Sequence, residues 1–280
     1  MTHPTAGSQR PDPLGVELRE VAVQVATAAA ELVARRRAEV LGSGTVRTKT
    51  SGTDPVTLAD TESEQLIRSE LGRLRPGDAV LGEEEGGDAA VDGLRWLIDP
   101  IDGTVNFLYG LPFYAVSVAV QRDGQSIAGA VVEVSSGRVF SAALGAGATL
   151  DGQPLRCNDV TDPALALVAT GFGYQARRRV TQGAVVAELL PQVRDVRRVG
   201  SAALDLCAVA AGWLDAYYEH GLSPWDWGAG VLIAAEAGAD VRPPPATAPG
   251  SHGELTFAAA PGVSAAVLSL VERAWSGPMP

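Results

Sequence analysis

The chain has 280 residues and a mass of 28.9 kDa, and 46% of its residues are hydrophobic, which suits one large folded unit or two smaller ones that share a core. Its formal charge of −11 and pI near 4.8 argue against nucleic acid or an anionic membrane as a main partner. Cys157 and Cys207 occur in a chain with no charged-then-apolar leader at its start, so we expect no disulfide framework and a cytoplasmic location.

The first elements are predicted to be helical. We expect residues 1–13 to be a flexible N-terminus, and the apolar spacing over residues 14–41 predicts an amphipathic helix. The polar stretch 49–60 is typical of a loop, and it leads into a second predicted helix over residues 61–74.

Two short apolar runs come next, and each opens onto an acidic turn. Residues 79–81 predict a strand that leads into Gly-Glu-Glu at 82–84, and residues 95–98 predict a strand that leads into Asp-Pro-Ile-Asp-Gly-Thr at 99–104. Open α/β sheets place their sites at the carboxyl ends of strands, so both turns are expected at such a site.

An antiparallel meander is predicted next. The strand-like runs 114–121, 126–134 and 138–143 are separated by short Gly-containing turns. They complete an N-terminal α+β half, residues 14–150, which contains both acidic turns.

The remaining residues, 151–280, are expected to form a C-terminal half of α/β type, because strand-like runs there alternate with helical ones. This half contains Asp226. Its predicted elements are a strand over 165–170, helices over 181–190 and 202–211, a strand over 216–219, and helices over 228–237 and 263–275.

Three acidic segments look like parts of one metal site: the two turns above and Trp-Asp at 225–226. Carboxylates gathered from distant segments repel each other unless cations hold them together, and hard cations such as Mg²⁺ favour oxygen ligands. The chain has three histidines, none with the paired spacing of a zinc site, so any metal is expected to be oxygen-bound. Each segment alone is also a common turn or helix cap.

The segments 96–107 (Trp-Leu-Ile-Asp-Pro-Ile-Asp-Gly-Thr-Val-Asn-Phe), 82–84 and 225–238 strongly resemble the inositol monophosphatase family, and the pattern looks most like the bacterial inositol-1-monophosphatases. The resemblance covers most of the chain. It implies an α/β protein with a layered αβαβα sandwich of the sugar-phosphatase type. It also implies a dependence on Mg²⁺, with roughly two or three ions bound, inhibition by Li⁺, and a homodimer.

The resemblance also implies a set of metal ligands. Glu83, Asp99 and the backbone carbonyl of Ile101 would hold the first Mg²⁺. Asp99, Asp102 and Asp226 would hold the second, so that Asp99 bridges the pair. A third, weaker Mg²⁺ would lean on Glu83 through waters.

The catalytic roles follow from the same resemblance. The nucleophile would be a metal-bound water, oriented by the Thr104 hydroxyl, which in turn would be hydrogen-bonded to Asp60. Lys49 would help to order the water of the third metal. Phosphate oxygens would meet the N–H groups of Gly103 and Thr104, where a helix begins.

Substrate hydroxyls would be bound by Glu219 and Asp226, with the backbone of Gly200, Ser201 and Ala202 lining the pocket. A carboxylate at Glu219 suits a polyol because it accepts hydrogen bonds from vicinal hydroxyls. Sister phosphatases that act on other sugars share an acidic residue at this place, so Glu219 alone does not identify the substrate.

The sequence therefore predicts a Mg²⁺-dependent phosphomonoesterase whose partner is a small phosphate monoester, myo-inositol 1-phosphate or a related polyol phosphate. Two alternatives stay open. One is a sister activity on histidinol phosphate, fructose 1,6-bisphosphate or adenosine 3′,5′-bisphosphate. The other is a protein without catalysis that works as a binding or regulatory subunit.

Overall fold

The computed structural model describes residues 11–43, 46–48, 55–87 and 92–275, and it does not describe the side chains of residues 38–57. The α-helices are α1 (Pro13–Ser43), α2 (Leu58–Leu74), α3 (Thr104–Tyr109), α4 (Ala176–Leu189), α5 (Ala202–Ala210), α6 (Pro224–Glu236) and α7 (Pro261–Ala274). The short 3₁₀ helices are η1 (Pro163–Leu165), η2 (Leu190–Gln192) and η3 (Gly250–His252). The strands are β1 (Val46–Thr48), β2 (Pro55–Thr57), β3 (Ala79–Gly82), β4 (Gly86–Gly87), β5 (Leu94–Asp102), β6 (Ala115–Arg122), β7 (Gln125–Glu133), β8 (Arg138–Ala143), β9 (Gly147–Leu150), β10 (Gln153–Pro154), β11 (Leu167–Thr170), β12 (Asp195–Arg197), β13 (Ala216–His220), β14 (Asp240–Arg242) and β15 (Leu255–Ala259).

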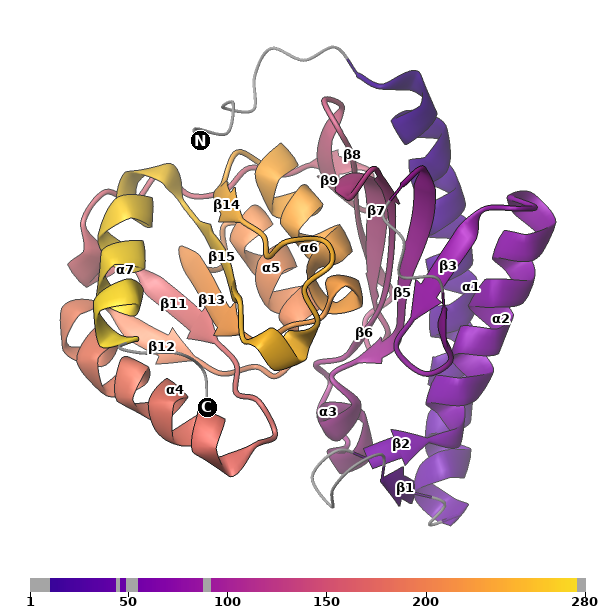
Figure 1. Ribbon diagram of the computed structural model, residues 1–280, viewed down its shortest axis with the longest axis horizontal. Coiled ribbons are helices and arrows are strands. Elements are labelled where there is room, and N and C mark those ends of the chain that lie inside the picture. Colours follow the sequence, from indigo (N-terminus) through magenta and orange to yellow (C-terminus); the bar gives the residue numbers. More distant parts are fainter. Residues whose placement is uncertain (1–10, 44–45, 49–54, 88–91, 276–280) are drawn as a thin grey trace.

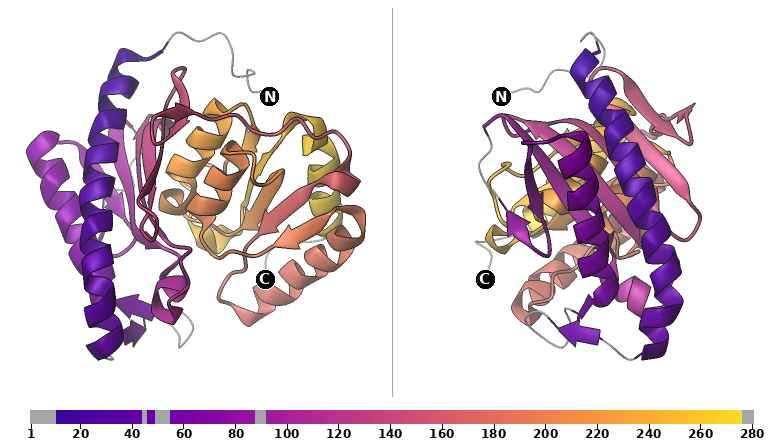
Figure 2. Two further views of the ribbon diagram at one scale, coloured as in Figure 1. Left: turned by 180° about the vertical axis from the view of Figure 1, so that it is seen from behind. Right: turned by 90° about the vertical axis from the view of Figure 1, so that its right-hand side faces the viewer.

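These elements stack in five layers (Figures 1 and 2). Helices α1 and α2 cover the outer face of an eight-stranded sheet of order β10-β9-β8-β7-β6-β5-β3-β4. Helices α5 and α6 fill the space between this sheet and a five-stranded sheet of order β12-β11-β13-β15-β14. Helices α4 and α7 cover the far face of the smaller sheet. The predicted αβαβα sandwich is confirmed.

Strand β5 shows why the larger sheet needs a helical layer on both faces. Successive side chains of a strand point to opposite faces. Trp96 and Ile98 accordingly lie in the core beneath α1 and α2, whereas Leu97 lies in the core shared with α5 and α6. All three side chains are buried, so the strand is hydrophobic without alternation.

The topology brings the two predicted acidic turns together. Strands β3 and β5 pair in parallel, with Gly82 opposite Ile98, so their carboxyl ends lie at the same edge of the sheet. Strands β6, β7 and β8 form the predicted antiparallel meander on the other side of β5. The division near residue 150 into two halves of one module stays a prediction.

Several element boundaries differ from the prediction. Helix α2 begins at Leu58 rather than at residue 61, and α6 begins at Pro224 rather than at residue 228, which places Asp226 inside the first helical turn. The short strands β1, β2, β4, β9, β10, β12, β14 and β15 were not predicted, and β2 lies within the stretch 49–60 that was expected to be a loop. Within the described ranges, none of the helices combines the length and the apolar character needed to span a bilayer.

His220, at the end of β13, gives a prediction about stability. Its ring stacks on Trp275 with a centroid separation of 3.6 Å, and burial, together with the nearby Arg178, lowers its pKa from 6.5 to about 4. Between these values the unfolded chain binds a proton that the folded protein does not, so folding is weakened as the pH falls, by at most about 1.4 kcal/mol per pH unit. Urea titrations should therefore show the stability advantage of the wild type over His220→Gln shrinking from pH 6.5 to about 4. A difference in unfolding free energy that stays constant over this pH range would contradict the lowered pKa of His220.

Candidate active site

The first acidic turn joins β3 to β4. The N–H of Glu83 donates to the carbonyl of Ile98 on β5 (3.2 Å), and the next two N–H groups, of Glu84 and Glu85, donate to the carboxylate of Glu64 on α2 (2.8 and 3.0 Å). Three successive amides are thus bound, and the backbone that carries the half-buried Glu83 side chain is fixed from both sides.

The second acidic turn contains an irregularity of β5. The register of β5 against β6 shifts between Asp99 and Asp102, and Pro100 there has no N–H to give to the ladder. In a regular strand, Asp99 and Asp102 would point to opposite faces of the sheet, because they are three residues apart. A bulge adds one residue to the strand and changes the direction in which the following side chains point. Both aspartates are buried, and Asp99 Oδ1 accepts a hydrogen bond from the N–H of Ile101 (3.0 Å).

Asp102 connects the two halves of the chain. Its carboxylate accepts hydrogen bonds from the Ser201 hydroxyl (2.5 Å) and from the N–H groups of Ala202 (3.3 Å) and Ala203 (2.8 Å), where α5 begins. A carboxylate is favoured there by the free N–H groups and the dipole of a helix N-terminus. The predicted substrate-lining segment 200–202 therefore lies directly against a predicted metal ligand.

Gly103 makes this contact close. Its φ is +90°, in the left-handed region, and a Cβ atom there would lie 2.8 Å from the carbonyl oxygen of Phe113 and 3.2 Å from that of Gly200. A side chain would therefore push the start of α3 away from the segment that carries Ser201.

Asp226 enters from α6. It is the third residue of the helix, and its Oδ2 accepts a hydrogen bond from the N–H of Ser223, the residue that precedes the helix (2.6 Å). Pro224 suits the first helical position, where no N–H is needed. The bond to Ser223 fixes the Asp226 side chain at the helix start.

The charges of these carboxylates act on one another. Burial raises the pKa of Asp99 well above its usual value, and the negative charges of Glu83, Asp102, Asp226 and Asp60 raise it further. Burial and then Glu83 and Asp102 likewise raise the pKa of Asp226. Burial outweighs the hydrogen bonds from Ser201 and its neighbours and raises the pKa of Asp102 to about 6. A cation would relieve this repulsion.

The candidate metal ligands are widely spaced. In the part of the chain that the structure describes, no three carboxylate, imidazole or thiol groups are gathered tightly enough to enclose an ion. Mutual repulsion among carboxylates favours such spacing. The donors themselves are all oxygens on buried or half-buried side chains, which is the set that Mg²⁺ prefers, so the residues fit this metal in kind.

The predicted catalytic residues are only partly placed as expected. Asp60 is buried in the first turn of α2, near enough to influence the pKa of Asp99. The Thr104 hydroxyl, however, donates to the carbonyl of Ile101 (3.0 Å) and not to Asp60. A hydroxyl has one proton, so it cannot serve both acceptors at once. Lys49 lies outside the described residues.

Glu219 lies on β13, and its Oε2 accepts a hydrogen bond from the Tyr217 hydroxyl (2.7 Å). Burial raises the pKa of Glu219 to about 7, and the charge of Glu219 in turn contributes to the raised pKa of Asp226. A Cβ atom on Gly171 would lie 1.7 Å from Glu219 Oε2, so the carboxylate rests on a backbone that has no side chain there. The structure thus places the predicted polyol-binding carboxylate beside the acidic cluster.

Sequence reasoning missed residues that hold the site together. Asn106 donates from Nδ2 to the carbonyls of Phe113 (2.7 Å) and Val199 (3.0 Å), which links α3 to the segment before α5. Glu64 organises the first acidic turn. Glu64 lies four residues after Asp60, on the same face of the helix, and this spacing could have identified it as part of the site. No pattern in the neighbouring sequence pointed to Asn106.

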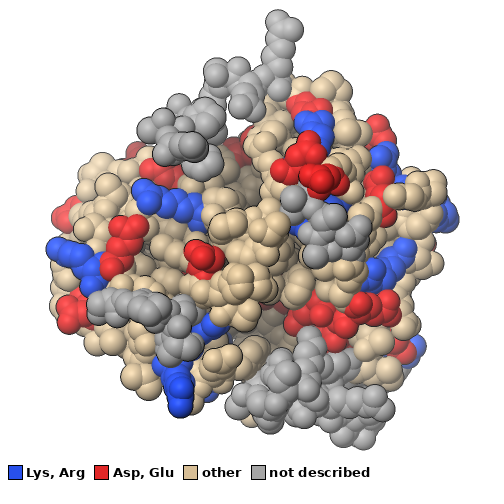
Figure 3. Space-filling model, viewed as in Figure 1, with Lys and Arg blue, Asp and Glu red and all other residues tan. Residues whose placement is uncertain are grey.

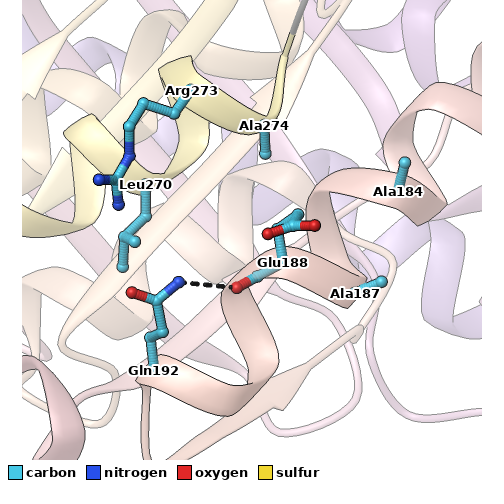
Figure 4. Close-up of a pocket in the computed structure, with 7 residues that line it drawn as sticks. All are labelled: Ala184, Ala187, Glu188, Gln192, Leu270, Arg273 and Ala274. Atoms are coloured by element: carbon cyan, nitrogen blue, oxygen red, sulfur yellow. Dashed lines mark hydrogen bonds between the residues drawn. The ribbon is translucent and has the colours of Figure 1, made fainter.

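Two surface features lie apart from this cluster. A hollow of about 500 Å³ lies between α4 and α7 and contains none of the predicted site residues (Figure 4); its lining is Ala184, Ala187, Glu188, Gln192, Leu270, Arg273 and Ala274. On the face of the described chain shown in Figure 3, basic side chains are scattered among acidic and neutral ones and form no continuous patch.

Comparison with known proteins identifies relatives over nearly the whole chain. The sequence pattern described as the inositol monophosphatase family matches residues 16–273. A Mycobacterium leprae protein named inositol-1-monophosphatase is 54% identical over 279 residues, covering 94% of this chain and 96% of the relative. A Pasteurella multocida protein named Nus factor SuhB is 37% identical, covering 85% of this chain and 92% of the relative.

The fold has the same relatives. The solved structure named Mycobacterium tuberculosis SuhB matches with a TM-score of 0.80 at 47% identity, covering 95% of this chain and 98% of that one. Sequence and structure therefore point to one family over the whole length of the described fold.

Proposed function

Since the chain belongs to the inositol monophosphatase family and is a phosphatase, we propose that it hydrolyses myo-inositol 1-phosphate and related polyol phosphates to the free polyol and phosphate. The observation that carries the proposal is the position of Asp99. This buried carboxylate is surrounded by the charges of Glu83, Asp102, Asp226 and Asp60. Such a cluster is costly without cations and suits a site built to bind them.

We assign the ligands as the sequence predicts. Glu83, Asp99 and the Ile101 carbonyl would hold one Mg²⁺, and Asp99, Asp102 and Asp226 a second, with a third leaning on Glu83 through waters. Bound Mg²⁺ supplies Lewis-acid activation of water and neutralises the charge of the phosphate. The hydrogen bonds to Asp102 and Asp226 from backbone N–H groups orient these two carboxylates before any ion binds.

The protein's own residues bind and orient the ester. The N–H groups of Gly103 and Thr104 would face the phosphate at the start of α3. Asp60 and Thr104 would accept and pass on the proton of the attacking water. The Thr104 hydroxyl must release the Ile101 carbonyl to do so, because its single proton is directed there. Lys49 is assigned to ordering a water near Glu83.

The polyol would lie between the two halves of the chain. Glu219 and Asp226 would accept hydrogen bonds from its hydroxyls, and the backbone of Gly200, Ser201 and Ala202 would line the pocket. The hydrogen bonds from Ser201 and Ala202 to Asp102 support this placement, since they set the lining segment against the proposed metal ligands.

Replacing Glu219 tests the polyol contact. Glu219→Gln should raise the KM for myo-inositol 1-phosphate about tenfold and change kcat little, because an amide offers one acceptor oxygen where the carboxylate offers two. Phenyl phosphate has no ring hydroxyls, so its KM should stay the same. Steady-state kinetics with both esters on the same enzyme preparation measure the contrast. Equal changes for the two esters would show that Glu219 does not bind the polyol.

The substrate itself is tested by phosphate release from a panel with and without Mg²⁺. The panel contains myo-inositol 1-phosphate, histidinol phosphate, fructose 1,6-bisphosphate and adenosine 3′,5′-bisphosphate. We expect the highest kcat/KM for the inositol ester and no phosphate release when Mg²⁺ is left out. Preference for another ester would transfer the assignment to a sister activity. Absence of phosphate release from every ester would favour the alternative of a binding or regulatory protein without catalysis.

Three further properties belong to the same proposal, namely inhibition by Li⁺, assembly as a homodimer and a cytoplasmic location. Li⁺ would act through the proposed metal site, because it too prefers oxygen ligands. The small phosphate ester would be the main partner; because the ester and the protein are both negatively charged (the protein's net charge is −11), bound cations would be needed to hold it.

A further inference from the structure

The buried face of α2 changes character along its length. Ile67 and Leu71 are apolar, whereas Asp60, Ser63 and Glu64, one to two turns earlier, are polar and just as deeply buried. Buried polar groups are costly unless each finds a partner. The partners of Ser63 and Glu64 lie in the two acidic turns of the candidate active site.

Each acidic turn is bound by one of these side chains. The Ser63 hydroxyl donates to the carbonyl of Pro100, between Asp99 and Asp102 (3.3 Å). The Glu64 carboxylate accepts from the N–H groups of Glu84 (2.8 Å) and Glu85 (3.0 Å), directly after Glu83.

Glu64 is itself held in place. Arg68, one turn further along α2, pairs with it (Nη2 to Oε1, 2.8 Å) and also binds the carbonyl of Gly86 in the same acidic turn. The Glu64 side chain is fully buried, and a Cβ atom on Gly82 would lie 2.3 Å from its Oε1. The glycine before Glu83 therefore leaves the space that the carboxylate occupies.

We propose that Glu64 is a positioning residue of the active site, which fixes the acidic turn so that the Glu83 carboxylate is held where a divalent cation binds. The inference rests on the proposed function, because it takes Glu83 as a metal ligand. Glu64 does not touch the ion. It acts through two backbone N–H groups, and its loss lets the turn that carries Glu83 move. Partners that orient metal ligands typically change metal affinity about 10- to 100-fold when they are replaced.

The test compares Glu64→Gln with Glu70→Gln, the same chemical change on the same helix at an ion pair with Arg73 outside the site. Mg²⁺ is titrated into the metal-free proteins by calorimetry, and phosphate release is measured against Mg²⁺ concentration. Glu64→Gln should weaken Mg²⁺ binding at least about tenfold, while kcat at saturating Mg²⁺ stays within about threefold. Glu70→Gln should match the wild type in both assays.

The variant Glu83→Gln distinguishes a failure of the positioning role from a failure of the proposed function. If Glu83→Gln binds Mg²⁺ more weakly than the wild type but Glu64→Gln binds it equally well, the positioning role is overturned and the proposed function stands. If Glu83→Gln also binds Mg²⁺ like the wild type, the ligand assignment is wrong and the role of Glu64 falls with it.

A measurement on the wild type covers the case in which Glu64→Gln does not fold. In the metal-free protein, the amides of Glu84 and Glu85 should exchange with deuterium at least about a hundredfold more slowly than in an unstructured peptide, since both are bound to a buried carboxylate. Exchange at the peptide rate would overturn the proposal.

Discussion

Asp99→Asn is expected to lower phosphate release at saturating Mg²⁺ by at least about a thousandfold and to leave the metal-free protein as stable as the wild type or more stable. The loss of activity follows because Asp99 is the proposed bridge between two cations. The stability follows because the pKa of Asp99 is raised by burial and by four neighbouring carboxylates, so a neutral side chain relieves repulsion. Asparagine keeps Oδ1, which accepts the N–H of Ile101.

Thermal unfolding with and without Mg²⁺ measures the second half of this prediction. The wild type should be stabilised by Mg²⁺, because an ion that binds only the folded state shifts unfolding by mass action. Asp99→Asn should lose that increment. Asp123→Asn, at an exposed turn with a positive φ that asparagine tolerates, is the matched control. Turnover within tenfold of the wild type would show that Asp99 is not a bridging ligand.

Asp102→Asn is expected to remove activity to a similar extent but, unlike Asp99→Asn, to destabilise the protein by about 1–3 kcal/mol. Both Asp102 oxygens accept hydrogen bonds, from Ser201, Ala202 and Ala203. The amide nitrogen of asparagine would face one of these donors and leave it unsatisfied in a buried place.

Urea unfolding of the metal-free proteins measures this difference. Ser201→Ala removes one of the three donors and also the side-chain cap that accepts the N–H of Leu204, so it should cost a similar amount, about 1–3 kcal/mol. An Asp102→Asn protein as stable as the wild type would mean that the contact with the start of α5 contributes little to joining the two halves.

Patterns within one element were enough to predict much of the fold. The position of each acidic turn after a strand was predicted from two apolar runs, and the meander from Gly-containing turns. The parallel pairing of β3 with β5, which brings the two turns together, was not predicted. The missed strand β14 has three residues, too few for a period of two to be distinct from chance. Pro224 is the first residue of α6, a position at which proline is favoured, and this signal for the start of the helix was missed.

The site was predicted by residue type, but its internal connections were not. The acidic segments stood out because two of them follow apolar runs and the third precedes a helical run, whereas the roles of their carboxylates as metal ligands came from the resemblance to the family. The contact of Asp102 with Ser201 spans 99 residues of sequence, and no local signal encodes it. The bulge at Pro100 and the role of Glu64 likewise depend on which elements pack together. The bond from Thr104 to the Ile101 carbonyl replaces the expected bond to Asp60 because the carbonyl lies within the same turn.

The central claim is that Glu83, Asp99, Asp102 and Asp226 bind divalent cations together. Crystals soaked in Mn²⁺, an oxygen-seeking ion with anomalous scattering that can substitute for Mg²⁺, test it most directly. Anomalous difference peaks should lie between these four side chains, with Asp99 touching more than one ion. Peaks confined to other carboxylates, with the four side chains still bound only to protein atoms, would contradict the account.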